Sequence, residues 1–195
     1  VMTADSTNVE KQGYTKSERI VGESLTRIFG KTKGRIIIAT FASNIHRLQQ
    51  IINTAEKFNR KVAVSGRSMV NVVAVATELG YLNIPDNMLI DLNDISKYED
   101  NEVVLITTGS QGEPMSALAR MASAEHKKVE IKRGDLIIIS AHPIPGNEKL
   151  ISKVINLLFE KGARVVYNDI ADIHVSGHAS QEELKLINVM AKPKF

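Results

Sequence analysis

Five short runs of apolar, mostly β-branched residues recur along the chain and constrain its fold more than any other feature. Each run is nearly continuous rather than alternating, and glycine or polar residues bound it, which is typical of parallel strands buried on both faces. The runs lie at 35–40, 61–65, 102–108, 135–140 and 163–168. A further short strand is expected at Met88–Ile90, within an otherwise irregular segment.

Segments with helical periodicity separate these runs. They lie at 44–60, 68–80 and 147–162. The second segment opens on Ser68 as an N-cap and the third on Asn147, with Gly162 in the usual position after a helix. Alternation of strand and helix at this spacing predicts an α/β fold. We expect a doubly wound, mostly parallel Rossmann-like sheet with helices on both faces.

The two ends of the chain lie outside this repeating unit. Residues 15–30 have helical periodicity, and Thr15 and Glu18 have the spacing of a capping box. Residues 180–195 predict another helix. Because the chain opens on valine and closes on KPKF, we expect it to be a piece of a larger protein.

Composition excludes several classes of protein. The 195 residues are 43% hydrophobic and 24% charged, as in ordinary globular proteins, and no run approaches the roughly 18 apolar residues of a membrane span. The net charge is only +3, and with no tryptophan and 5% aromatics a stacking platform for bases is disfavoured. The absence of cysteine excludes disulfides and thiolate metal sites and fits a cytoplasmic protein.

The turns after the strands are the candidate binding elements, because ligands of doubly wound sheets bind beyond the carboxyl ends of the strands. They read FASN (41–44), SGRSM (65–69), TGSQGEP (108–114), SAHPIPGN (140–147) and VSGHAS (175–180). Small residues let backbone N–H groups approach a phosphate, and Arg67 adds forked donors. Helix capping is the simpler explanation of any single turn, but the five turns together, one of them with an arginine, predict an anion-binding rim. Neither a Walker motif nor a dinucleotide fingerprint is present.

The histidines differ in what the sequence predicts for them. His46 lies near the start of a helix and suits a capping or buried role, and His126 is expected on the surface. His142 has no assigned role, while His178, between Gly177 and Ala179, is a candidate active-site histidine. No H-x-H-x-D-H motif is present, so no residue of this chain is predicted to bind a metal.

In this order, ADSTN, FASNIHRLQQ, GRSM, TTGSQGEP, PIPGN, SGHAS and KPKF resemble bacterial ribonuclease J. That family is the β-CASP branch of the metallo-β-lactamase fold nucleases, and the resemblance runs from about Ala4 to Phe195. It implies that residues 1–16 are the edge of a metallo-β-lactamase domain and residues 17–172 a β-CASP domain. Residues 173–195 would be a segment returning into the first domain.

The resemblance also implies an activity for the parent protein. We expect a metal-dependent ribonuclease, with 5′-to-3′ exonuclease and endonuclease modes, acting in RNA decay and processing. Its two metal ions, typically zinc, would bind ligands absent from this chain, so the isolated chain is expected to be inactive. The expected partners are RNA, copies of itself in a dimer or tetramer, and an RNA-decay complex, without a membrane.

Site residues follow from the same resemblance. Asp5 and His178 match two signature motifs that pair close to the metals, where a carboxylate on one ring nitrogen leaves the other free to donate to a phosphate or protonate the leaving 3′ oxygen. Gly177 would leave room for the sugar-phosphate, and Ser180 would cap the next helix and also meet phosphate. The residues implied in binding nucleotides or a 5′ monophosphate are Arg67, Ser68, Ser110 and Gln111, with Asn44 and His46 behind them.

Two alternatives remain open on the sequence. One is a non-catalytic Rossmann-like module that binds an anionic small molecule. The other is a degenerate ribonuclease J paralogue that serves as a structural partner, against which the retention of Asp5 and His178 counts. Both signature residues must meet in space for the nuclease interpretation to hold, although His178 lies 173 positions after Asp5 in the chain.

Overall fold

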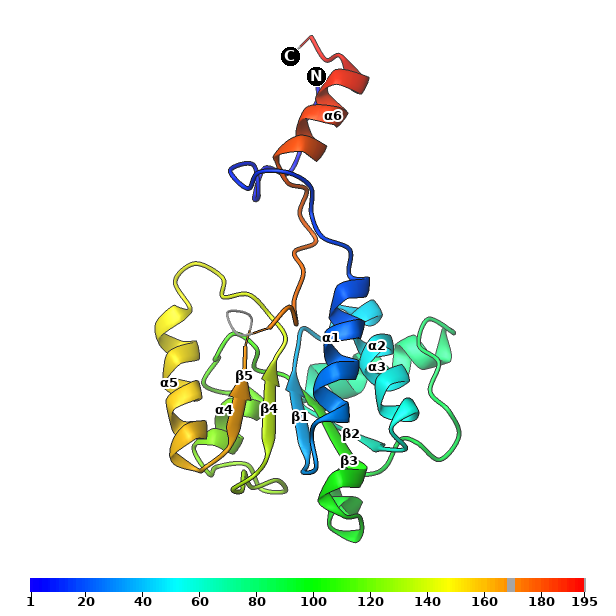
Figure 1. Ribbon diagram of the computed structural model, residues 1–195, viewed down its shortest axis with the longest axis vertical. Coiled ribbons are helices and arrows are strands. Elements are labelled where there is room, and N and C mark those ends of the chain that lie inside the picture. The colour runs from blue at the N-terminus through cyan, green and yellow to red at the C-terminus, as the bar shows by residue number, and fades with distance from the viewer. Residues whose placement is uncertain (168–170, 195) are drawn as a thin grey trace.

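A single parallel sheet forms the centre of the computed structural model, which describes residues 1–167 and 171–194 (Figure 1). The strand order is β2-β3-β1-β4-β5, and every pairing is parallel, which confirms the predicted fold class. The strands are β1 (Ile36–Ala39), β2 (Lys61–Ser65), β3 (Val103–Thr107), β4 (Leu136–Ile139) and β5 (Arg164–Val166). The predicted 163–168 strand ends on a residue that lies outside the described ones.

The central strand β1 explains why the apolar runs are continuous. It pairs with β3 on one side and β4 on the other, and all four of its residues are buried. Ile36 and Ile38 belong to one hydrophobic cluster, whereas Ile37 and Ala39 belong to a second cluster. Because alternate side chains point to opposite faces, a strand covered on both faces needs an apolar residue at every position.

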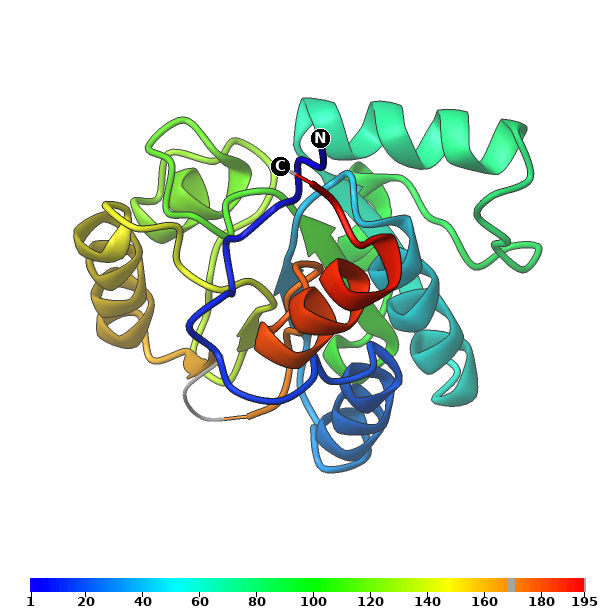
Figure 2. The same cartoon turned by 90° about the horizontal axis from the view of Figure 1, so that it is seen from above.

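Helices on the two faces of the sheet add further residues to both clusters (Figure 2). Residues of α1 (Arg19–Gly30), α2 (Ile45–Lys57) and α3 (Arg67–Glu78) join the first. Residues of α4 (Ala117–Ala122) and α5 (Glu148–Glu160) join the second. Two short 3₁₀ helices, η1 (Leu92–Lys97) and η2 (Asp100–Glu102), precede β3.

The helix starts differ from the sequence prediction in two places. Helix α3 begins at Arg67 with Gly66 in the cap position, so Ser68 lies in the first turn and is not the cap. Helix α1 begins at Arg19, and Glu18 makes no side-chain capping bond, so the predicted Thr15–Glu18 capping box is wrong. Both errors have one cause, because the spacing of polar residues does not reveal which partner a side chain meets in space.

The predicted strand at Met88–Ile90 forms only one bridge. The Val62 N–H donates to the carbonyl of Met88 at 2.9 Å, and the Ile90 N–H donates to the carbonyl of Val62 at 2.9 Å. These bonds cover the outer side of β2, which is the edge strand of the sheet. The segment therefore protects an edge that would otherwise be open to pairing.

Residues 1–16 and 172–194 leave the body together and form a projecting arm, at whose tip both chain ends lie (Figure 1). Asn8 bridges to Ser180, and the Gln181 N–H donates to the carbonyl of Lys11 at 2.9 Å. The arm ends in α6 (Gln181–Ala191), which has no buried residue. Within residues 1–167 and 171–194, no helix is both long and apolar enough to cross a membrane.

A buried ion pair joins β1 to β4 at the amino edge of the sheet, opposite the arm. Arg35 Nε donates to Asp135 Oδ1 at 3.1 Å, and Nη2 donates to Oδ2 at 2.6 Å. The two side chains are 8% and 1% exposed. Such a two-pronged pair fixes the geometry of both residues, because the guanidinium plane matches the carboxylate.

We expect Asp135→Ala to lower the free energy of unfolding by about 3–5 kcal/mol, because it leaves the Arg35 charge buried without a partner. Urea denaturation measures this loss. The control is Asp100→Ala, which breaks an ion pair to Lys132 whose side chains are about half exposed and is expected to cost less than about 1 kcal/mol. Equal losses in the two variants would contradict the assignment.

Candidate active site

The switch point of the sheet lies between β1 and β4. The chain leaves β1 for β2 at one edge of the sheet and leaves β4 for β5 at the other edge. A crevice at such a point is the usual ligand site of a doubly wound fold. Here the protein fills it, because Arg47 is fully buried and donates hydrogen bonds to the Ser140 hydroxyl and, at 2.8 Å, to the Ile173 carbonyl.

The arm that rises above this point carries the paired signature residues. His178 Nδ1 and Asp5 Oδ2 are joined by a hydrogen bond, and the two side chains are about half exposed. The Thr7 N–H donates to the other oxygen, Asp5 Oδ1, at 2.7 Å. Bonds from Thr7, and next the bond from His178, lower the pKa of Asp5 from 3.8 to about 2. The carboxylate is therefore ionised at neutral pH, and its two oxygens have separate partners.

Residues of the N-terminal segment hold the backbone on either side of His178. The buried Asn8 amide donates to the Ser176 hydroxyl at 2.8 Å and to the His178 carbonyl at 3.1 Å. The Thr15 hydroxyl donates to the same carbonyl at 2.8 Å. Asn8 and Thr15 thus fix the backbone that carries the imidazole, although they lie 170 and 163 positions before His178 in the chain.

Ser180 caps α6, as expected, in a capping box with Glu183. Glu183 Oε2 accepts from the Ser180 N–H at 2.7 Å and from the Thr15 N–H at 3.0 Å, and these bonds lower the pKa of its carboxyl group. Ser180 is only 5% exposed, so its hydroxyl serves the arm itself in this conformation. Thr15, predicted to cap α1, belongs to this network instead.

Gly177 lies beside His178 in open space. A Cβ atom added there would meet no described heavy atom within 4 Å. The protein surrounding Gly177 therefore does not require a glycine, and the space beside His178 is open.

The turn after β2 carries the exposed candidates for anion binding. Arg67 and Ser68 are exposed at the N-terminus of α3, where backbone N–H groups are free of a side-chain cap. Arg67 and Lys128 line a groove of about 840 Å³ between α3 and residues 84–92. Its wall is largely apolar, and Glu78 and two aspartates also line it, so its charge is mixed.

Ser110 and Gln111 are buried, with 3% and 2% exposure. The Gln111 amide donates to the His142 carbonyl at 2.9 Å, and its oxygen accepts from the Ile144 N–H at 2.8 Å. This side chain thus ties the turn after β3 to the turn after β4. At the start of α2, the Asn44 side chain caps the helix by accepting from the Arg47 N–H at 3.0 Å, and His46 is exposed.

Sequence analysis missed two residues. His126, expected on the surface, is partly buried; its Nε2 contacts the Ser65 hydroxyl at 3.1 Å, and its Nδ1 accepts from the Val129 N–H at 3.1 Å. Burial, and next Arg120, lower its pKa. The polar residues around His126 in the sequence did not indicate that it would be buried. The burial of Arg47 could have been predicted, because Arg47 lies beside Leu48 on the apolar side of α2.

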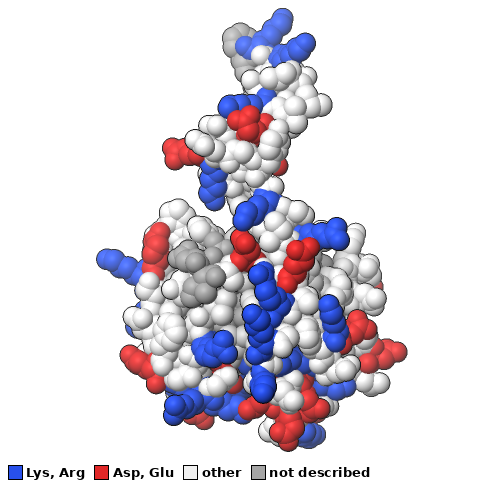
Figure 3. All heavy atoms as spheres, viewed as in Figure 1, with Lys and Arg blue, Asp and Glu red and all other residues white. Residues whose placement is uncertain are grey.

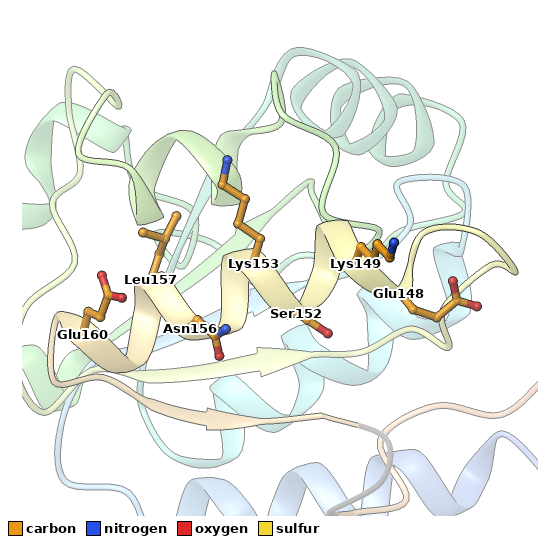
Figure 4. Close-up of a pocket in the computed structure, with 7 residues that line it drawn as sticks. All are labelled: Glu148, Lys149, Ser152, Lys153, Asn156, Leu157 and Glu160. Carbon is orange, nitrogen blue, oxygen red and sulfur yellow. The ribbon is translucent and has the colours of Figure 1, made fainter.

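Among the described residues, no group of three or more histidine, aspartate or glutamate side chains could by itself hold a metal ion. A hollow of about 510 Å³ follows α5, but all seven residues that line it belong to this one helix (Figure 4). On the face seen in Figure 3, positive and negative side chains are interspersed over the body.

A parallel Rossmann-like sheet with an arm rooted at its switch point defines the class of the protein. The family model for the β-CASP domain of ribonuclease J matches residues 33–158. The chain therefore belongs to the ribonuclease J β-CASP family, which confirms the resemblance seen in the sequence motifs.

Curated relatives extend this similarity over the whole chain. It is 51% identical to Ribonuclease J of Helicobacter pylori strain J99 over 195 residues and 48% identical to Ribonuclease J of Thermus thermophilus. Identity to Ribonuclease J2 of Bacillus subtilis is 45% over 194 residues. Each alignment covers 100% of this chain but 28%, 34% and 35% of the respective relatives, so the chain spans about a third of their length or less.

We expect the Asp5 carboxyl group to titrate near pH 2 in NMR spectra of the side-chain carboxyl carbon, well below 3.8. Because the folded pKa is lowered, the stability that Asp5 contributes is complete above pH 3.8 and is lost as pH falls towards 2. In His178→Ala the titration should remain below 3.8, since Thr7 makes the largest contribution. A midpoint at 3.8 in the unaltered chain would contradict the contact geometry.

Proposed function

We propose that the parent protein is a ribonuclease that hydrolyses RNA phosphodiester bonds in 5′-to-3′ exonuclease and endonuclease modes. In this proposal the present chain contributes RNA binding and an Asp–His pair that acts as the acid. The observation that carries the proposal is the contact between Asp5 and His178, on an arm at the carboxyl edge of the sheet. Family membership supports the same reaction class.

The chemistry follows from the tautomer. An ionised Asp5 accepts a hydrogen bond only from a protonated Nδ1, so the other ring nitrogen of His178, Nε2, is left for a ligand. When the ring carries a second proton, Nε2–H donates to a phosphate oxygen or transfers its proton to the leaving 3′ oxygen as the P–O bond breaks. The open space beside Gly177 supports access of a sugar-phosphate to this nitrogen.

RNA binding is assigned to the turns at the carboxyl edge. Arg67 and Ser68 are exposed and would contact a 5′ monophosphate or the backbone directly. Ser110 and Gln111 are buried and would act behind them by shaping the turns. Asn44 sets the start of α2 and so presents the exposed His46.

The arm would belong to a metallo-β-lactamase domain formed with residues outside this chain. Apolar side chains of α6 support this, because Leu186, Val189 and Met190 are 52%, 64% and 74% exposed and an added domain would cover them. Metal ions, zinc by family expectation, would bind residues of that domain that lie outside this chain. Cytoplasmic location, a dimer or tetramer and membership of an RNA-decay complex complete the proposal.

In the whole protein, His178→Ala should lower kcat for RNA hydrolysis by about 10²–10⁴-fold, because it removes the proton donor. Metal content, measured on the same preparation by elemental analysis, should be unchanged. Asp5→Asn should have a milder effect in the same direction. Depleted metal would instead make His178 a ligand, and unchanged kcat would favour a non-catalytic binding module. The isolated chain is expected to show no appreciable cleavage.

Arg67→Ala should weaken binding of 5′-monophosphorylated RNA more than binding of 5′-hydroxyl RNA. The slope of log affinity against log salt should fall by about one, since one phosphate contact is lost. Fluorescence anisotropy at several salt concentrations measures both effects. Arg133→Ala, at an exposed arginine just before β4 and so at the opposite edge of the sheet, is the matched control. Equal losses for both RNA ends would reject the assignment.

A further inference from the structure

Arg47 is an arginine with no exposed surface, in the first turn of α2. A guanidinium group does not lose its charge in proteins, so its burial requires partners close at hand. Buried ion pairs are weak contributors to net stability, because the loss of hydration offsets the attraction. A gain in stability therefore does not explain why an arginine is buried at this position.

The partners of Arg47 come from the segments through which the arm joins the body. Nε donates to Glu18 Oε1 at 2.5 Å, immediately before α1. Nη1 donates to the Ser140 hydroxyl after β4 and to the Ile173 carbonyl at 2.8 Å. The Ser140 hydroxyl in turn donates to the same Ile173 carbonyl at 2.5 Å. One planar group thus joins Glu18, just after the N-terminal segment of the arm, and Ile173, in its C-terminal segment, to the end of β4.

Other contacts at the root of the arm do not impose a comparable geometry. Lys16 and Asp172 form an ion pair at 3.0 Å, but their side chains are 62% and 56% exposed, and the pair joins only one arm strand to the other. Ile173 is buried in the first hydrophobic cluster, and apolar packing alone is non-directional. Nη2 of Arg47 finds no acceptor within the described part of the chain, so the site is not optimised for stability.

We propose that Arg47 is a positioning residue that sets the direction in which the arm leaves the body. It thereby sets where the Asp5–His178 pair stands relative to the RNA-binding turn at Arg67. This inference rests on the proposed function. Its physical basis is the rigid fork of the guanidinium, which holds two acceptors at a fixed angle, whereas the point charge of a lysine does not.

The test is Arg47→Lys in the whole protein, with two measurements. Hydrogen exchange at residues 173–175 should become at least about tenfold faster, because the Ile173 carbonyl loses its anchor. The kcat for 5′-monophosphorylated RNA should fall about 10–100-fold while KM changes less than about threefold, since the reacting groups are displaced and the RNA-binding turn is intact.

Arg60→Lys is the matched control. Arg60 is also buried, at 5% exposure, just after α2, but it donates to the carbonyls of Gly34 and Thr32 at the amino edge, far from the arm. We expect it to change thermal stability but neither kcat nor exchange at 173–175. An equal fall of kcat in both variants would overturn the proposal, because it would reflect general destabilisation.

Two further outcomes are decisive. Unchanged exchange in Arg47→Lys, or faster exchange with unchanged kcat, would overturn the positioning role. If the unaltered protein does not cleave RNA, the proposed function fails, and the exchange measurement alone decides whether Arg47 fixes the arm. Should Arg47→Lys not fold, Ser140→Ala removes only one acceptor and should produce the same two changes at smaller size.

Discussion

The interaction on which the rest of the structure depends is the burial of the Arg47 guanidinium at the switch point. It fills the crevice that a doubly wound sheet ordinarily offers to a ligand. Burial, and next the neighbouring Arg47, lower the pKa of His174 to about 4, so that imidazole is neutral beside the guanidinium. Glu18 supplies the opposing charge. The protein therefore uses its switch point to anchor a projecting segment.

The Asp5–His178 pair stands on the arm and outside the crevice, and this placement has a structural consequence. The two segments that carry the pair are neither helix nor strand and have few buried side chains, so hydrogen bonds hold the pair in place of a hydrophobic core. Asn8 and Thr15 bind the carbonyl of His178, and Glu183 joins the start of α6 to the N-terminal segment. Directional bonds of this kind fix an imidazole more closely than apolar contacts do.

The exposed turns and the arm divide the proposed work between them. Arg67 and Ser68 lie exposed in the first turn of α3, whereas the side-chain amide of Gln111 bonds to the neighbouring turn. Residues that look alike in sequence, small and polar after a strand, thus serve two purposes. Some meet solvent, and others bond to one another so that the exposed ones keep their places.

Much of this molecule was determined by its sequence alone. Continuous β-branched runs such as 35–40 predict strands buried on both faces, and ordered motifs identify the family, because both are local patterns. Asp5 and His178 were paired only through resemblance. Tertiary structure alone decided that Thr15 bonds across the arm, that Gln111 is buried, and that Arg47 lies at the switch point. Those outcomes depend on partners 29 to 168 positions away, and local spacing carries no information about such distances.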